Sequence, residues 1–364
     1  MELSGNRVTL ALAGTDNFLH VDRDDFVISL RTFEGGIERA YDTGCISPAY
    51  TVMKSSSEVL PPYYHYLLKS HSFISGLQTT VTGIRDGKTV RFDNFADLIL
   101  PVPARKDQQA IADFLDYETA RIDQLIEKKK RLVALASSYV ESLVDRAISD
   151  SSLPRKRFEY LTRRMTRPVD LNNHDELVRL GLYNRGRGIF KKPAADEEGM
   201  GASDFHFIKS GDLIISGQFA WEGAVAMATD DEEGCVVSHR YPVFRATDSI
   251  KTAYLLGFLR TKLGDFLLND CSRGSAGRNR PLNAWRLGKE KIPVPSIALQ
   301  EEVERAVVAH RKIKIKTEES IEKLNEFRSA LITAAVTGQI DVNKWSRRGH
   351  SDAKLDAIAK EMEA

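Results

Sequence analysis

Cysteine is scarce in this chain of 364 residues: Cys45, Cys235 and Cys271 are the only three, and they lie far apart. An odd, scattered set argues against a disulfide framework and against a zinc site built from thiolates, and it suits a reducing cytoplasm. No run of about 18 apolar residues is present, so no membrane-spanning helix is predicted. The opening MELSGNRVTLALAG has no basic stretch followed by a long apolar run, so secretion is not expected.

Motifs of known enzyme classes are also missing. The sequence contains no GxxxxGK[ST], no HExxH and no GxSxG. The eight histidines are scattered, and the spacing of His65 and His71 does not place them on one face of a helix. We therefore predict no catalytic residue and no metal site.

Two near matches need to be weighed. Leu60-Pro61-Pro62-Tyr63 resembles the (Asn/Asp/Ser)-Pro-Pro-(Tyr/Phe) motif of amino-methyltransferases, but Leu60 cannot accept a hydrogen bond from a target amine. A helix that starts at a proline explains the segment better. Glu127-Lys128-Lys129 could be a nuclease fragment, yet it lies in a long helical pattern where charges are typical of a solvated face.

The chain contains a long internal repeat. One copy opens PVPARKDQQAIADFLDYETARIDQLIEKKKRL and the other opens PVPSIALQEEVERAVV, with Gln108 and Gln300 each five residues after the second proline. In both, two prolines fix an extended approach to a long helix. The helix of the first copy is predicted to end near Ser149, and that of the second spans about 300–337.

Apolar residues in both helices recur in alternating steps of four and three, which is typical of a coiled coil. A helix of about 40 residues is about 60 Å long and cannot bury its apolar stripe alone, so each copy is the expected partner of the other. The predicted seam comprises Ile111, Leu115, Ile122, Leu125, Leu132, Tyr139, Leu143, Val303, Ile313, Leu324, Phe327 and Leu331.

The regions before the two helices echo each other. DDFVIS (24–29) matches GDLIIS (211–216), GCISPAY (44–50) matches GCVVSHRY (234–241), and PYYHYLLKS matches TAYLLGFLR. Strands are expected in VTLALAG, DDFVISL and CISPAYTVM, and one short helix in LPPYYHYLLKSHSFISGL. We therefore predict an α+β fold in which globule and long helix alternate twice. The first globule is predicted to be short, because the segment ahead of Asp24 is much shorter than that between Arg155 and Gly211.

Basic residues are segregated although the net charge is only +1. Residues 153–192 carry eleven Lys and Arg against four acids, and residues 271–291 carry six against one. Arginine can grip phosphate or read guanine, and asparagine can read adenine, so we predict nucleic-acid binding. The candidate DNA-binding residues are Gln78, Thr79, Thr80, Arg85, Lys88, Arg91, Arg163, Arg164, Arg185, Arg187, Arg273, Arg278, Asn279 and Arg280.

These segments together carry a family resemblance. IPVPSIALQEEV with ALITAAVTGQIDV, and LPVPARKDQQAIADFLDYETARIDQLIEKKKRLV, resemble the DNA-specificity (S) subunits of prokaryotic type I restriction–modification systems over nearly the full chain. The resemblance implies two target-recognition domains that each read half of a split, asymmetric DNA site. It also implies that the two helices pack as an antiparallel coiled coil with pseudo-twofold symmetry, act as a ruler and dock two methyltransferase subunits.

The resemblance gives five segments: a target-recognition domain at 1–100, a long helix at 101–150, a second recognition domain at 151–292, a second long helix at 293–340 and a charged tail at 341–364. No cofactor is implied in this chain. S-adenosylmethionine would belong to the modification subunits, and ATP and Mg to the restriction subunit. Two alternatives stay open: a truncated or orphan relative that regulates by binding partners, and a self-sufficient DNA methyltransferase or nuclease.

Overall fold

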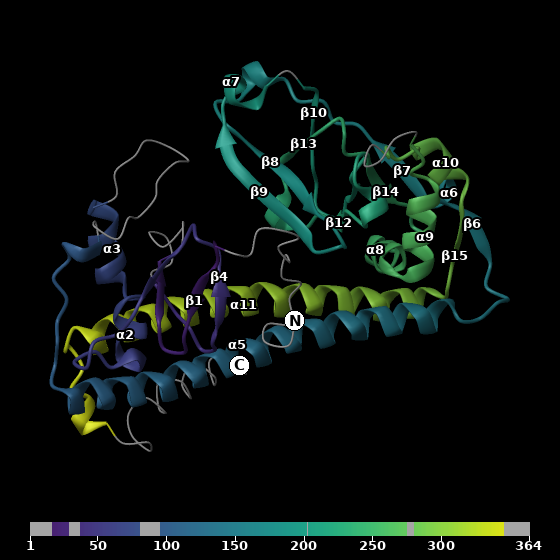
Figure 1. The fold of residues 1–364 in the computed structure, drawn as a ribbon. Coiled ribbons are helices and arrows are strands. Elements are labelled where there is room, and N and C mark those ends of the chain that lie inside the picture. The colour runs from purple at the N-terminus through teal and green to yellow at the C-terminus, as the bar shows by residue number, and fades with distance from the viewer. Residues whose placement is uncertain (1–16, 29–36, 81–94, 202, 275–279, 346–364) are drawn as a thin grey trace. The chain divides into compact units, whose positions relative to one another are not determined.

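The structure is a computed structural model that describes residues 17–28, 37–80, 95–201, 203–274 and 280–345. It divides into two compact units, residues 1–129 with 318–364 and residues 130–317. Two long helices, α5 (Arg105–Ile148) and α11 (Ile297–Val336), contribute a part to each unit (Figure 1). The prediction of two long helices is confirmed, and the five-segment division stays a prediction.

The described residues of unit 1 form two small antiparallel sheets. In one, β1 (Leu19–Val21) pairs with β4 (Gly44–Ile46), and in the other the order is β3 (Glu38–Arg39), β2 (Phe26–Ile28), β5 (Thr51–Met53). The expected strand in CISPAYTVM is therefore two strands, because a turn at Pro48, closed by Tyr50 N–H to Ser47 O at 3.1 Å, separates β4 from β5. The expected strand in VTLALAG lies outside the described residues.

The expected single helix after these strands is two helices, α2 (Pro61–Leu67) and α3 (His71–Thr80). The chain breaks between them at Ser70, whose hydroxyl donates to Leu67 O at 2.7 Å and so competes with the helical pattern. Tyr63 and Leu77 are fully buried and pack with β2 against the unit 1 parts of α5 and α11. Burying side chains of this size stabilises the fold by about 1.5–3 kcal/mol each.

Unit 2 has two four-stranded sheets and a short antiparallel pair. The first sheet has the order β12 (Val225–Met227), β11 (Leu213–Ile215), β14 (Val243–Ala246), β7 (Thr162–Met165), all antiparallel. The second has the order β10 (Phe205–Phe207), β13 (Val236–Ser238), β8 (Leu177–Tyr183), β9 (Gly188–Ala195). The pair is β15 (Lys291–Pro293) with β6 (Arg155–Arg157).

The sheet that contains β11 is the middle layer of unit 2. Leu213 and Phe244 lie on the face that packs on the helices, whereas Ile214 and Val243 lie on the face that packs on the second sheet. This alternation is the period of two expected for a strand buried on both sides. The helices of this unit are α6 (Phe158–Leu161), α7 (Glu197–Met200), α8 (Thr252–Arg260), α9 (Lys262–Asp270) and α10 (Ala284–Lys289), with short 3-10 turns η3 (Leu171–Asn173), η4 (Ala220–Glu222) and η5 (Asp230–Glu232).

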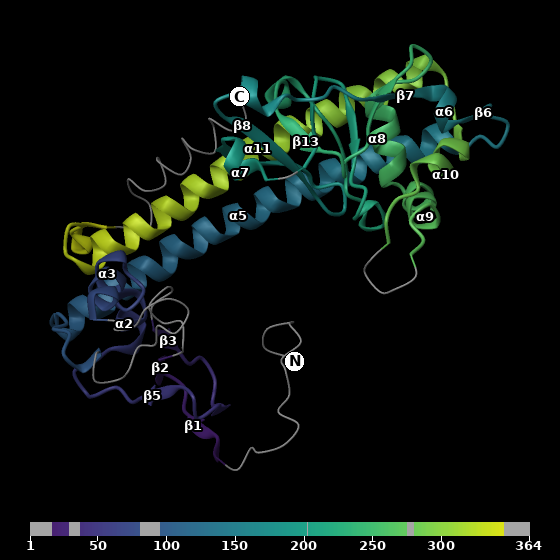
Figure 2. The same cartoon turned by 90° about the horizontal axis from the view of Figure 1, so that it is seen from above.

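The parts of α5 and α11 in each unit lie side by side and antiparallel (Figures 1 and 2). Ion pairs connect Asp123 with Arg328 at 3.3 Å in unit 1, and Arg146 with Glu302 at 2.5 Å in unit 2. Of the predicted seam, Ile111, Leu115, Ile122, Leu143, Val303, Leu324 and Leu331 are buried, and Leu125, Ile313 and Phe327 are half-buried.

The seam prediction is wrong at Leu132 and Tyr139, which are 48% and 57% exposed. The positions of α5 that are buried or, at Val133 and Ala136, half-buried run from Ile111 to Ala147 in ten steps over 36 residues, or 3.6 residues a step. A straight helix drifts about 20° per heptad from a strict 3.5 repeat, so the heptad pattern leaves the buried face after three or four heptads. Val140 takes the buried place that the heptad assigned to Tyr139.

The internal repeat is present in the backbone. Asp24 and Gly211 both have positive φ, at 74° and 84°, and each N–H donates at 2.9 Å to a residue directly after a strand, Ala40 O after β3 and Ala228 O after β12. The next residue is a buried aspartate in each copy. Asp25 and Asp212 both accept a bond at 2.9 Å from the backbone N–H three residues earlier.

The two Pro-Val-Pro entries repeat a second arrangement. Gln108 and Gln300 are both buried, and each side-chain oxygen accepts a bond from the residue before a short helix, Leu60 N at 2.9 Å and Lys251 N at 2.8 Å. Each side-chain nitrogen donates to the second proline of its own entry at 2.9 Å. Each glutamine therefore ties the start of a long helix to the globule before it.

After α11 a short 3-10 turn, η6 (Val342–Lys344), is described, and the rest of the predicted charged tail lies outside the described residues. Within the described part of the chain, no helix combines the length and the apolarity that a membrane span needs.

Candidate nucleic-acid interface

The predicted DNA-binding residues fall into three groups in the structure. Arg85, Lys88, Arg91, Arg278 and Asn279, together with the side chain of Thr80, lie outside the described residues. Gln78 and Thr79 are exposed near the end of α3 in unit 1. The remaining six residues, all arginines, belong to unit 2 and can be compared directly.

Arg163 and Arg164 lie on β7, the edge strand of the middle sheet, and both side chains are exposed. Their neighbours on β14 are Arg245 and Phe244. Because successive residues of a strand point to opposite faces, the two guanidinium groups reach different sides of this edge. Among the described residues, no carboxylate forms an ion pair with either.

Arg185 and Arg187 lie in the turn between β8 and β9 and are exposed. Arg185 has a φ of 59°, and Gly186 has 60°, so the turn contains two successive left-handed residues. This conformation is unfavourable for arginine and suits glycine. Two backbone bonds of 2.7 Å hold it, from Arg185 N to Glu222 O and from Gly186 N to Gly223 O. A strained residue fixed by its surroundings is a reason to look for function at this turn.

The arginines around 270–286 are largely occupied by other groups of unit 2. Asp270 forms ion pairs with both Arg273 and Arg286, and these bonds hold the pKa of its carboxyl below the usual value. Arg280 lies over the ring of Trp221 at 5.1 Å and donates to Ser272 O at 3.1 Å. The sequence therefore overstates the charge that this segment can offer to a ligand.

The turn η4 brings the two basic segments together. In η4, Glu222 O accepts a hydrogen bond from Arg185 N. The guanidinium of Arg280 lies over the ring of Trp221, and Trp221 O accepts a bond of 3.0 Å from the side-chain amide of Asn269. We call the surface formed by Arg185, Arg187, Trp221, Arg273 and Arg280 the η4 surface. Arg163 and Arg164 are not part of it, because β7 and β12 are opposite edges of the middle sheet.

The η4 surface has the chemistry of a nucleic-acid contact. Arg185 and Arg187 are exposed, and the described residues provide no carboxylate that pairs with them. Burial lowers the pKa of Arg260 and of His310, both in unit 2. The charge of Lys314 also lowers the pKa of His310, and the ammonium group of Lys314 donates to Arg187 O. Positive charge with an adjacent aromatic ring is the combination that binds a phosphate backbone and stacked bases.

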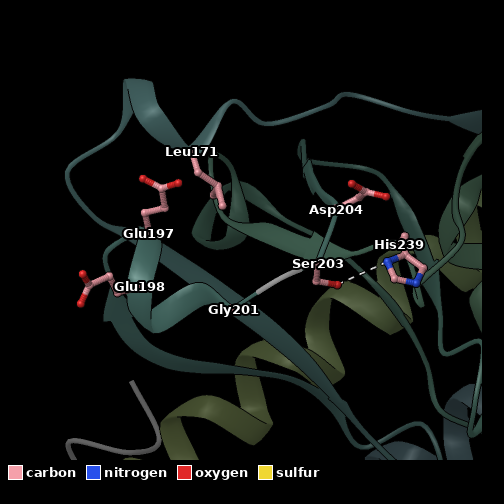
Figure 3. A pocket seen from close by; sticks show the side chains of 7 residues that line it. All are labelled: Leu171, Glu197, Glu198, Gly201, Ser203, Asp204 and His239. Carbon is pink, nitrogen blue, oxygen red and sulfur yellow. Dashed lines mark hydrogen bonds between the residues drawn. The ribbon is translucent and has the colours of Figure 1, made fainter.

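A hollow elsewhere in unit 2 is acidic. It is lined by Leu171, Glu197, Glu198, Gly201, Ser203, Asp204 and His239 (Figure 3). Ser203 Oγ and His239 Nδ1 are 3.3 Å apart, but the carboxylate of Asp204 is directed away from this pair. Among the described residues no group orients the imidazole, so the pair does not form a nucleophilic triad. The carboxylates also make the hollow unfavourable for phosphate.

The Leu60-Pro61-Pro62-Tyr63 segment is the start of α2, with Leu60 as the residue before the helix and prolines in its first two positions. Tyr63 is fully buried, and its hydroxyl donates to Val336 O at 3.4 Å. A ring in this position cannot stack on a base that enters from solvent. The structure therefore favours a helix that starts at a proline over a methyltransferase motif.

A solved structure with a similar fold comes from a type I restriction–modification system. One chain, from a study of "complex assembly and conformational transition of the type I R-M system", is 16% identical, with a TM-score of 0.52 over 87% of this chain and 82% of that one. The fold is that of a type I restriction–modification chain. Two further matches cover 88% of this chain: the HsdS subunit from Thermoanaerobacter tengcongensis (15% identity, TM-score 0.42, 82% of that chain) and the type I S subunit from M. genitalium (14%, 0.46, 84%).

No family model and no curated protein sequence matches the chain. The similarity therefore concerns the fold, and the arguments about function depend on the residues described above.

Sequence reasoning missed Trp221 and Asp270, which decide how the basic segments are arranged. Trp221 lies 59 residues before Arg280, the arginine that stacks on its ring, so no local pattern links them. One signal was available: tryptophan is rare here, with three in the chain, and two of them, Trp221 and Trp285, lie within or near the basic region. Trp285 is 73% exposed beside the loop that precedes α10.

Proposed function

We propose that this chain is the DNA-specificity subunit of a type I restriction–modification complex. The observation that carries the proposal is the duplication: the same turn and the same glutamine contact occur in both units, each joined to the same two long helices. A duplicated reader in a single chain suits a DNA site made of two halves. The type I fold and the sequence resemblance support the same conclusion.

In this proposal each globule is a target-recognition domain that reads one half-site. The η4 surface supplies phosphate contacts in the second domain, and Arg163 and Arg164 supply a separate contact from β7. Because the two globules differ in size and sequence, the two half-sites are unequal and the complete site is asymmetric. The helices pair as an antiparallel coiled coil, and their length sets the spacer.

The chain itself would carry out no chemistry. Two modification subunits would dock on it, bind S-adenosylmethionine and methylate a flipped adenine, and a restriction subunit would join through them and use ATP and Mg. The protein would act in the cytoplasm of a prokaryote on double-stranded DNA.

Co-expression with a cognate modification subunit, followed by sequencing of methylated bases in the host DNA, tests the proposal. The expected result is one split adenine motif, and exchange of residues 155–290 for those of another specificity subunit should change one half of it. The matched control is a chain in which Lys262, exposed on α9, is changed to Ala, which should leave the motif unaltered. Methylation without a split motif would contradict the proposal.

A second candidate function is a regulator that binds partner subunits without reading DNA. The observation that favours it is that the described residues of unit 1 form fewer strands than those of unit 2. A complex with modification subunits that shows equal affinity for all DNA sequences in competition would support this function over the first.

A further inference from the structure

A hollow of about 130 Å³ lies in unit 2 where α9 meets α8 and the β6–β15 pair (Figure 1). Its apolar lining consists of Phe258 and Leu267, which are buried, and of Leu263 and Phe266, which are 41% and 70% exposed. An engineered apolar cavity of about 150 Å³ takes up one benzene molecule, so this hollow has room for one leucine or phenylalanine side chain. We call it the α9 hollow.

The internal repeat gives α9 a counterpart in unit 1. Thr261, directly before α9, and Ser70, directly before α3, form the same contacts. Each hydroxyl donates at 2.7 Å to the carbonyl three residues earlier and accepts from the N–H three residues later, at 3.2 Å and 3.3 Å. The residues three and seven positions after the hydroxyl are buried in both helices. The two helices can therefore be compared residue by residue.

The two helices differ on the face that is exposed. The positions of Leu263 and Phe266 in α9 are taken by Ser72 and Ser75 in α3, where Ser72 is exposed and Ser75 is half-buried. The same kind of helix therefore forms with serine at both places, and folding does not require the apolar pair. Large apolar side chains that are exposed beside a hollow, and that the fold does not need, indicate a surface that another molecule covers.

The charge around the α9 hollow that is not already neutralised is net positive. Arg155 on β6 and Lys291 on β15 are both exposed, and in the described part of the chain neither has a carboxylate within ion-pair distance. Asp270 is held in ion pairs with two arginines, so the half-buried Glu290 is the lining acid that opposes these two bases. Two bases against one acid favour an occupant that carries carboxylates. The two carboxylates in the lining repel phosphate, which favours a protein over DNA as the occupant.

We propose that the α9 hollow binds an acidic amphipathic helix of a partner protein. The helix inserts one leucine or phenylalanine side chain into the hollow, its apolar face covers Leu263 and Phe266, and its carboxylates face Arg155 and Lys291. This is the helix-in-groove mode of recognition, in which the apolar face supplies affinity and the charges supply specificity. Because unit 1 has serines in place of the apolar pair, one helix binds per chain. The proposal does not depend on DNA reading.

The probe is a fluorescein-labelled peptide of sequence EEALEELFEEALEE, which is titrated into the full chain and followed by fluorescence anisotropy. We expect saturable binding of one peptide per chain. Leu263→Ser with Phe266→Ser introduces the residues that α3 carries, so the helix should still fold, and the affinity should fall about thirtyfold, the effect of losing one interface anchor. Arg155→Glu with Lys291→Glu should also weaken binding, and it should reverse the preference between this peptide and the basic peptide KKALKKLFKKALKK.

The matched control is Leu135→Ser with Val308→Ser, which removes two apolar side chains of similar exposure, 58% and 42%, from the parts of α5 and α11 in unit 2. It should bind the acidic peptide within about twofold of the unchanged chain. Melting curves verify that each variant is folded, and a duplex oligonucleotide should bind the serine variant and its control equally. The proposal is overturned if the acidic peptide does not bind, if the serine variant binds it as well as the control does, or if the basic peptide binds the unchanged chain equally well. It is also overturned if the serine variant loses affinity for the duplex in place of the peptide.

Discussion

Gln108 offers a sharp test of how the long helix is attached to its globule. Its side chain makes three bonds of 2.9 Å, accepting from Leu60 N and donating to Glu58 O and Pro103 O. Gln108→Leu keeps the volume of the side chain and removes all three bonds. The Leu60 N–H is left buried without a partner at a cost of about 1–3 kcal/mol, and each carbonyl adds about 0.5–1 kcal/mol.

The total destabilisation of unit 1 is therefore about 3 kcal/mol, or about 6–12 °C in the melting temperature of a unit of this size. Differential scanning calorimetry of the full chain measures the shift. Hydrogen exchange of the first turn of α2 should also accelerate, because Leu60 is the residue directly before that helix and its N–H would lose its partner.

Gln109→Leu is the control, because Gln109 is the neighbouring residue on the same helix and is exposed. It should melt within about 1 °C of the unchanged chain, as expected for a surface substitution. If Gln108→Leu had the same melting temperature as Gln109→Leu, the glutamine contact would not hold the helix to the globule, and the reasoning from the repeat would fail.

Three further predictions concern single side chains. Arg185→Gly should stabilise unit 2 by about 0.5–1 kcal/mol, because glycine is not strained at a positive φ, and melting curves measure this effect. The same change should weaken DNA binding and reduce the slope of log affinity against log salt concentration by about 1 in salt titrations. Lys262→Ala should change neither stability nor DNA binding. Asp212→Asn should destabilise unit 2 by about 3–5 kcal/mol in urea unfolding, because the buried carboxylate pairs with two arginines, and Asp248→Asn on the surface should have no such effect. Burial lowers the pKa of His65 to about 4 from 6.5, so the unfolded chain takes up the proton first as pH falls. Stability from this residue is complete above pH 6.5 and is lost towards pH 4, and the loss between pH 7 and 5 is about 1–2 kcal/mol. A His65→Phe chain that lost as much stability over this range would contradict the account.

The duplication and the two long helices could be predicted from local information. Pro-Val-Pro entries, a glutamine at a fixed distance and about 40 residues without Gly or Pro determine backbone conformation over a few residues at a time. The echo of DDFVIS and GDLIIS also held, because a turn that needs a left-handed residue accepts Asp24 or Gly211 in the same place.

The buried face of α5 could not be predicted to its end. A pattern of apolar residues gives the period of a helix only approximately, and a difference between 3.5 and 3.6 residues a turn accumulates along 44 residues. Tyr139 therefore fits the heptad in the sequence but lies in solvent, and Val140 is buried in its place.

Charge in the sequence predicts a basic region, but the availability of each charge depends on the fold. Arg273 and Arg280 look equivalent to Arg185 in a count of basic residues. Folding places Asp270 beside the first and Trp221 beneath the second, and it leaves Arg185 exposed in a strained turn. Composition and periodicity are properties of the chain alone, so they determine helices, repeats and regions of charge. Which arginine can meet a ligand is set by contacts between residues far apart in sequence, and those exist only once the chain has folded.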